Sequence, residues 1–102
     1  MLRVGIAGLG FMGRMHYRCW NELPQARVVA VCDAHADLVA RTRRAGGNIA
    51  GAAAEIDFDS FTLYTDFDRM LAEQQLDVVS ITLPTFLHAD FSIKALQAGV
   101  HV

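Results

Sequence analysis

The sequence has few cysteines, no excess of charge of one sign and no long uninterrupted hydrophobic run. Its only cysteines, Cys19 and Cys32, form no CxxC pair, so we expect no metal site and a reduced, cytoplasmic protein. The formal net charge is −2, from 9 basic and 11 acidic residues spread along the chain, which gives no electrostatic footprint for nucleic acid or anionic lipid. Charged residues and glycines interrupt the apolar start of the chain, residues 2–20, which therefore predicts neither a signal peptide nor a membrane span.

The composition is otherwise that of a folded domain. Hydrophobic residues make up 53% of the chain and charged residues 20%, so we expect a packed core rather than disorder. A chain of 102 residues is long enough for one domain and too short for two. We therefore treat residues 1–102 as one domain.

Short apolar runs alternate along the chain with segments of helical periodicity. The apolar runs predict strands at 2–7, 28–32, 61–64 and 77–82, and the opening of a fifth at 100–102. Helices are predicted at 11–21, 35–45, about 67–71 and 85–98. This alternation predicts an α/β fold with a doubly wound parallel sheet of the Rossmann type. Because Val102 falls within an apolar run that has no stop signal, we expect the sheet to be truncated at its C-terminal end.

Residue spacing also predicts helix faces. The apolar residues at helical spacing in the first helix are Met12, Met15, Cys19 and Leu23. Those on one face of the last helix are Phe86, Ala89, Ile93 and Leu96. We expect these two faces to be the apolar faces of their helices.

Helix ends and one long connection complete the expected outline. Thr65 and Thr85 are the expected N-caps of the third and last helices, and Gly99 is the expected end of the last. The segment 46–60 is longer than most connections and is interpreted as an insertion. The alternation of Ile56, Phe58 and Phe61 at its end could form a surface strand.

The clearest motif is the segment GLGFMG between the first predicted strand and the first predicted helix. A GxGxxG spacing in this context is typical of dinucleotide-binding turns. Gly8 permits the tight turn, Gly10 lets the backbone approach a pyrophosphate, and Gly13 lets the helix pack close to the strand. Phe11 and Met12 then offer backbone N–H groups at a helix N-terminus, where the dipole favours an anion. The alternative is a turn whose glycines serve packing only.

Asp33 follows the second predicted strand, 20 residues after Gly13. A carboxylate at this position accepts hydrogen bonds from an adenosine ribose and disfavours a 2′-phosphate, so the pattern predicts NAD(H) rather than NADP(H). Asp33 could instead cap the helix that follows it. Arg41, Arg43 and Arg44 lie deep in that predicted helix, and a solvated helix face explains them better than a bound phosphate does.

A second cofactor-facing segment is expected after the fourth strand, because ligands of doubly wound sheets lie outside the carboxyl ends of the strands. The residues there that we predict to face the cofactor are Thr82, Leu83, Pro84, Thr85 and His88. The run ALQAGVHV follows at 95–102.

Taken in order, the glycine turn with His16 behind it, Asp33, and the segment from Pro84 to His88 resemble the N-terminal domain of the Gfo/Idh/MocA oxidoreductases. The resemblance covers nearly the whole chain and fails only over 46–60. It implies hydride transfer between a nicotinamide and a sugar or cyclitol alcohol. It also implies that the loop 82–85 lies along the nicotinamide ribose with His88 nearby.

The same resemblance implies what lies outside this chain. The family's catalytic lysine belongs to a Glu-Lys-Pro motif expected just after Val102, so no catalytic residue is predicted within the chain. Lys94, the only lysine, lies in mid-helix without such a motif and is not assigned that role. The family's substrate domain is also absent, and we expect the chain alone to be inactive and the full-length protein to be a homo-oligomer.

Other interpretations remain open at this point. His88 could bond a nearby carbonyl as a first-turn helix residue, and His16 is expected to pack or cap rather than to act in catalysis. A non-catalytic module that senses the redox state of NAD(H) would need the same binding residues. A nucleotide-sugar or S-adenosylmethionine is less consistent with GxGxxG followed by a distal aspartate.

Overall fold

The computed structural model describes residues 1–35 and 56–102. Its elements are β1 (Leu2–Ala7), α1 (Phe11–Glu22), β2 (Ala26–Cys32), β3 (Thr62–Tyr64), α3 (Phe67–Glu73), β4 (Val78–Ile81), the 3₁₀ turn η2 (Thr85–Leu87) and α4 (His88–Gln97). All strand pairs are parallel, in the order β3-β2-β1-β4. The predicted doubly wound α/β fold is therefore confirmed. The predicted helix at 35–45 and most of the segment 46–60 lie outside the described residues.

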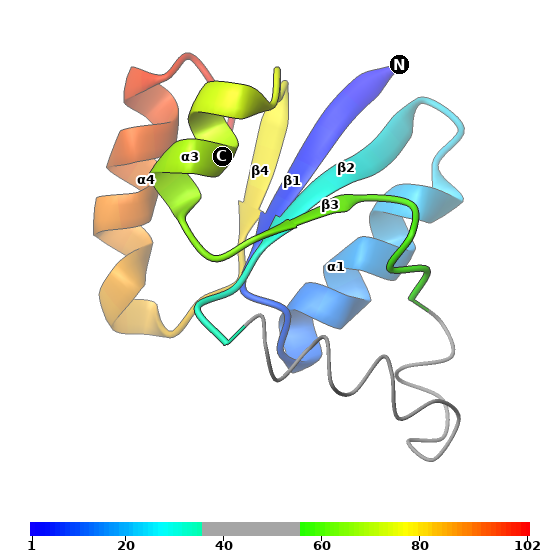
Figure 1. Ribbon diagram of the computed structural model, residues 1–102, viewed down its shortest axis with the longest axis horizontal. Helices are drawn as coiled ribbons and strands as arrows, with labels where there is room; N and C mark the ends of the chain where they lie inside the picture. The colour runs from blue at the N-terminus through cyan, green and yellow to red at the C-terminus, as the bar shows by residue number, and fades with distance from the viewer. Residues whose placement is uncertain (36–55) are drawn as a thin grey trace.

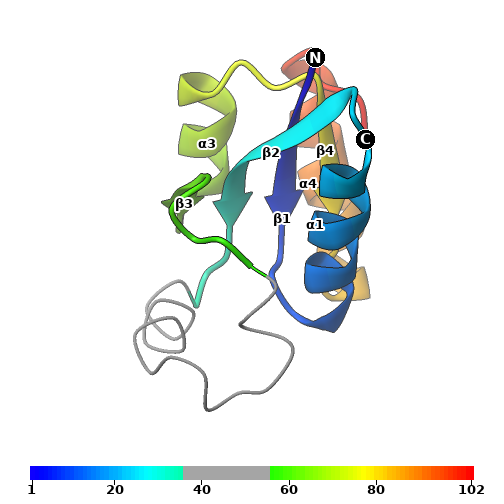
Figure 2. The ribbon, with the colours of Figure 1, turned by 90° about the vertical axis from the view of Figure 1, so that its right-hand side faces the viewer.

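Helices cover both faces of the sheet (Figures 1 and 2). α1 lies on one face, and α3 and α4 lie on the other. Apolar residues of the central strands are consequently buried between helices on both sides, with Val4, Ile6 and Ala7 fully excluded from solvent. This arrangement explains why the strands read as continuous apolar runs rather than as alternating ones.

The chain begins a fifth strand beside β4, as predicted. The His101 carbonyl accepts a hydrogen bond from the Val79 N–H at 2.8 Å, and the His101 N–H donates to the Asp77 carbonyl at 3.0 Å. A parallel bridge between Val78 and His101 results, while β4 pairs with β1 along its other edge. Gly99, with φ of +78°, ends α4 where the sequence predicted, because few residues other than glycine adopt this conformation.

α1 turns a different face to the sheet from the one predicted. Met12, Met15 and Leu23 are exposed, whereas Gly13 and Tyr17 are buried. The spacing of the methionines fits a helix but does not say which side meets the sheet. That side is decided by Gly13, which has no side chain to hold the helix away from β1.

The contact at Gly13 leaves no room for a side chain. A Cβ atom added there would lie 1.9 Å from the carbonyl oxygen of Gly8 and 3.1 Å from Oγ1 of Thr82. The first of these atoms belongs to the backbone and cannot move aside as a flexible side chain would. α1 can therefore reach its position over the sheet only with glycine at residue 13.

The segment before β3 does not form the surface strand that was considered. Ile56 and Phe58 are buried in the core under α1, and the Phe61 ring packs edge-on against Tyr17 at 5.7 Å between centroids. The carboxylate of Asp57 accepts a hydrogen bond from the Asp59 N–H at 3.0 Å, which closes a local turn instead of a strand ladder. The alternating apolar residues are thus core residues of a turn.

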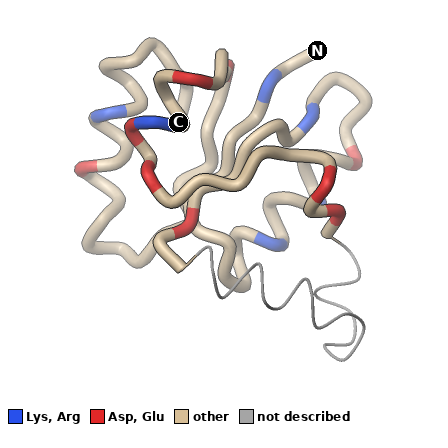
Figure 3. The backbone as a smooth tube through the Cα atoms, viewed as in Figure 1, with Lys and Arg blue, Asp and Glu red and all other residues tan. Residues whose placement is uncertain are grey.

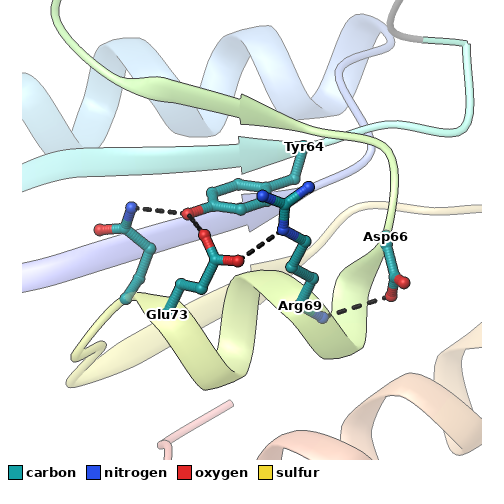
Figure 4. A network of polar contacts seen from close by, with 5 residues as sticks. Tyr64, Asp66, Arg69 and Glu73 are labelled. Carbon is teal, nitrogen blue, oxygen red and sulfur yellow. Dashed lines mark hydrogen bonds and ion pairs between the residues drawn. The ribbon is translucent and has the colours of Figure 1, made fainter.

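The N-cap of α3 is Asp66 and not Thr65 as predicted. Its side chain accepts a hydrogen bond from the Arg69 N–H at 3.3 Å. Within α3, the Arg69 guanidinium bonds Glu73, and this bond holds the pKa of that carboxyl below its usual range. Glu73 also accepts a hydrogen bond from the Tyr64 hydroxyl at 3.2 Å (Figure 4). The network ties the end of β3 to α3.

α4 also begins and packs differently from the prediction. Thr85 starts the 3₁₀ turn, and α4 then begins at His88 without a side-chain cap. The core face of α4 is formed by fully buried Ala95 and by Phe91, whose ring lies 4.7 Å from that of Phe67. The predicted apolar face is largely exposed, with Phe86 at 80% and Leu96 at 61%. A small residue at 95 allows α4 to approach the sheet, as glycine does in α1.

We predict that Gly13→Ala destabilises the protein strongly. The added methyl would overlap a backbone carbonyl, and overpacking of this kind costs about 1–3 kcal/mol or more. In a domain of this size that cost lowers the thermal midpoint by roughly 4–20 °C. Gly10→Ala is the matched control, because a Cβ at Gly10 meets nothing within 4 Å. Melting curves followed by circular dichroism compare the two, and equal midpoints would show that α1 can shift without cost.

The two cysteines are expected to differ in reactivity. Cys19 is exposed, whereas Cys32 is buried, and burial together with the nearby Asp33 and Asp66 raises the pKa of the Cys32 thiol to about 11. Because the thiolate is the reactive form, iodoacetamide at pH 8 should alkylate Cys19 alone in the folded protein. Peptide mass spectrometry measures the sites. Labelling of both cysteines at similar rates before denaturant is added would contradict the burial of Cys32.

Candidate functional site

The segments predicted to bind a ligand meet at the carboxyl edge of the sheet. The glycine turn follows β1, Asp33 follows β2, and the loop 82–88 follows β4 (Figure 1). From β1 the chain adds β2 and then β3 on one side of β1, and it then crosses back to add β4 on the other side of β1. The direction in which strands are added to the sheet therefore reverses at β1. Crevices at such switch points are where doubly wound sheets bind ligands.

The glycine turn presents an uncapped helix end. Gly8 has φ of +96°, and a Cβ there would lie 2.7 Å from the Thr82 carbonyl oxygen. Gly10 is the N-cap of α1 and supplies no side-chain hydrogen bond, and no acidic residue lies in the first turn. The first N–H groups of a helix have no partner within it. The N–H groups of Phe11, Met12 and Gly13 are therefore available to a ligand at the N-terminus of α1, where the helix dipole favours an anion.

The carboxylate of Asp33 bridges β2 and the glycine turn. Its Oδ2 atom accepts a hydrogen bond from the Leu9 N–H at 2.8 Å, and Oδ1 accepts one from the His35 N–H at 2.7 Å. An ionised carboxylate has about four acceptor positions, so two remain for hydroxyl groups of a ligand. The contact with Leu9, which sequence reasoning missed, fixes the carboxylate beside the turn.

Thr82 reaches the glycine turn from the opposite side. Its Oγ1 lies 2.7 Å from the Gly8 carbonyl oxygen and 3.1 Å from that of Ala7. Both partners are carbonyl groups, so the hydroxyl is the donor. The Thr82 N–H also donates to the Ala7 carbonyl at 2.9 Å, which continues the ladder between β1 and β4.

The remaining loop residues lie around Thr82. Leu83 is half-buried against Gly8, while Pro84 and Thr85 are exposed at the start of η2. His88 Nε2 lies 2.6 Å from the Leu83 carbonyl oxygen and must carry a hydrogen there, because a carbonyl only accepts. His88 thus holds the loop through a backbone carbonyl, which is the structural alternative considered for it.

A polar cluster on the α1 side of β4 was not anticipated. The Trp20 indole N–H donates to the Ser80 hydroxyl oxygen at 2.8 Å, and His16 Nδ1 lies 3.0 Å from the same oxygen. Trp20 and His16 are four residues apart in α1, a spacing that places both on one helix face. His16 therefore packs α1 against β4, in keeping with the packing role expected for it.

Other kinds of site find no support in the described part of the chain. Within 1–35 and 56–102, no group of three His, Cys, Asp or Glu side chains is placed to hold a metal ion. No helix in these two ranges is long and apolar enough to cross a membrane. Within the same two ranges, acidic and basic residues are interspersed rather than grouped by sign (Figure 3).

Comparisons with known proteins identify the family of this chain. Residues 2–102 match the Gfo/Idh/MocA family model, described as an oxidoreductase family with an NAD-binding Rossmann fold. D-apiose dehydrogenase of Paraburkholderia graminis is 34% identical over 95 residues, which cover 93% of this chain and 22% of that protein. Inositol 2-dehydrogenase of Salmonella typhimurium is 29% identical over 106 residues, which cover 99% of this chain and 27% of that protein.

A solved structure shows the same fold. The crystal structure of scyllo-inositol dehydrogenase from Lactobacillus casei, with bound NAD(H) and scyllo-inositol, matches with a TM-score of 0.76 at 23% identity. The match covers 100% of this chain and 27% of that one, so the chain spans about a quarter of the length of these relatives. With its strand order, glycine turn and family match, the chain belongs to the Gfo/Idh/MocA oxidoreductases and has their NAD-binding Rossmann fold.

Proposed function

We propose that the glycine turn and Asp33 bind NAD(H), and that the protein containing this domain transfers a hydride between nicotinamide and a sugar or cyclitol alcohol. The observation that carries the proposal is the uncapped N-terminus of α1 beside the fixed carboxylate of Asp33. An anionic pyrophosphate suits the helix end, and ribose hydroxyls suit the free acceptor positions of Asp33. A dinucleotide carries both the pyrophosphate and the ribose in one molecule.

The conformation of the glycine turn supports the proposed pyrophosphate site. A Cβ at Gly10 would point into open space, so the absence of a side chain leaves a cradle next to the first N–H groups of α1. Gly10, Phe11, Met12 and Gly13 would bind the pyrophosphate. The loop from Thr82 to Thr85 would lie toward the nicotinamide ribose, and Leu83, Pro84 and His88 would shape its wall. The bound nicotinamide supplies or accepts the hydride.

The substrate class rests on the relatives. D-apiose dehydrogenase and inositol 2-dehydrogenase act, by their names, on a sugar and a cyclitol. Both match nearly the whole of this chain. Because the chain spans only about a quarter of their length, the reaction and its substrate are proposed for the whole protein and not for the domain alone.

We predict that Asp33→Asn reduces the preference for NADH over NADPH. The substitution removes the negative charge that disfavours a 2′-phosphate and weakens the charge-assisted bonds to the ribose. The dissociation constant for NADPH divided by that for NADH should fall by about tenfold, as expected from the loss of one such bond. Calorimetric titration of each variant with NADH and NADPH measures it.

Asp68→Asn is the matched control for this titration. Asp68 lies on α3, its side chain is 64% exposed, and its carboxylate pairs with Lys94 of α4. The affinities for NADH and NADPH should therefore stay unchanged in Asp68→Asn. Tight binding of NADPH by the unmodified protein, or an unchanged ratio in Asp33→Asn, would contradict the assignment of Asp33 to the ribose.

Gly10→Ala tests the pyrophosphate cradle separately from the fold. Because its φ of −85° suits alanine and the added methyl meets no protein atom, the thermal midpoint should change by no more than about 4 °C. The methyl would occupy the space of the pyrophosphate, so affinity for NADH should fall by at least about tenfold. Fluorescence titration with NADH reads the affinity. A variant that is stable and binds NADH normally would place the pyrophosphate elsewhere.

A further inference from the structure

The peptide group between Gly8 and Leu9 is held at both of its ends. Its carbonyl oxygen accepts the Thr82 hydroxyl at 2.7 Å, and its N–H donates to Asp33 Oδ2 at 2.8 Å. A peptide group is planar, so the two ends turn together. Asp33 comes from the end of β2 and Thr82 from the end of β4, which are the two neighbours of β1 in the sheet.

The same carbonyl also supports α1. Gly13 lies against the Gly8 oxygen so closely that a Cβ would come within 1.9 Å of it. A rotation of the Gly8–Leu9 peptide would therefore displace the first turn of α1. It would also move the Leu9 N–H away from the Asp33 carboxylate. Gly8, with φ of +96°, is a residue that can rotate easily, because glycine adopts many backbone conformations.

We propose that Thr82 is a positioning residue for the dinucleotide, acting through the Gly8–Leu9 peptide and not by contact with the ligand. Its hydroxyl fixes the orientation of that peptide, and the peptide in turn fixes the α1 N–H groups and the Asp33 carboxylate. The inference rests on the proposed function and deepens it, since it assigns to Thr82 a role in the pyrophosphate and ribose sites.

The position of the hydroxyl favours this role. Its Oγ1 lies within hydrogen-bond distance of two carbonyl oxygens, that of Ala7 at the end of β1 and that of Gly8 in the turn, and the Gly8 oxygen is the nearer. The Thr82 backbone is itself held by its hydrogen bond to Ala7, which limits how far the side chain can move. The side chain is half-buried, while Thr85 in the same loop is exposed.

Binding measurements test the proposal with Thr82→Val, which removes the hydroxyl, and Thr82→Ser, which keeps it. Thr82→Val should lower the affinity for NADH and for ADP-ribose, which both carry the pyrophosphate, by about fivefold to tenfold. Thr82→Ser should restore affinity to within about twofold of the unmodified protein. Thr62→Val, an exposed threonine of β3, is the matched control and should change neither affinity.

A measurement without ligand separates this inference from the proposed function. Amide hydrogen exchange at Leu9, followed by NMR, should become faster in Thr82→Val and return to the original rate in Thr82→Ser, because the released peptide leaves Asp33 more often. Exchange at Val31, inside β2, should stay unchanged. If Thr82→Val does not fold, Thr82→Ala replaces it in both measurements.

The outcomes point to different failures. If the unmodified protein does not bind NADH, the proposed function is wrong, while the exchange at Leu9 still reports on Thr82. If the protein binds NADH and Thr82→Val binds it equally well, the positioning role is wrong. Equal losses in Thr82→Val and Thr82→Ser would also overturn it, because Thr82→Ser keeps the hydroxyl and should therefore keep the affinity.

Discussion

The close contact between Gly13 and the Gly8 carbonyl is the constraint on which the site and half of the core depend. A side chain at residue 13 would meet a backbone oxygen at 1.9 Å, so α1 can lie this near to β1 only with glycine there. Tyr17, one turn further along α1, then reaches the core beneath β1 and β2. The same approach places the N-terminus of α1 directly at the carboxyl end of β1.

Around this contact, the two neighbours of β1 hold the turn from opposite sides. Asp33 accepts the Leu9 N–H from the end of β2, and Thr82 donates to the Gly8 carbonyl from the end of β4. The Gly8 N–H also donates to the Cys32 carbonyl at 2.7 Å. Polar side chains and backbone groups thus satisfy the turn, and the first N–H groups of α1 are left to face outward. Burial raises the pKa of the adjacent Cys32 thiol, which keeps that neighbour of the site uncharged.

The strands and the site segments could be predicted because their signals are local. Val4 and Ile6 lie in a strand covered on both faces, and such a strand needs apolar residues at successive positions. The glycine turn and Asp33 follow strand ends within a few residues, so the sequence around each is sufficient to place them. Their gathering at one edge of the sheet follows from the parallel arrangement.

Helix faces and long-range bonds could not be predicted in the same way. The spacing of Met12 and Met15 is helical, but the choice of face depends on the fit of Gly13 against another segment. Thr65 and Asp66 are both good N-caps, and one residue of difference in where α3 begins decides between them. The bonds from Asp33 to Leu9 and from Thr82 to Gly8 join residues 24 and 74 positions apart, and no local pattern encodes them.

The separation of these partners in the chain links ligand binding to the order of folding. Loop closure over many residues has an entropic cost that must be met before such contacts form, so the Gly8–Leu9 peptide acquires its orientation only after β2 and β4 have both paired with β1. A ligand that recognises the oriented peptide would bind the assembled sheet and not a partly paired chain. Its concentration would then set how much of the protein is folded, and the domain would be most stable where its ligand is abundant.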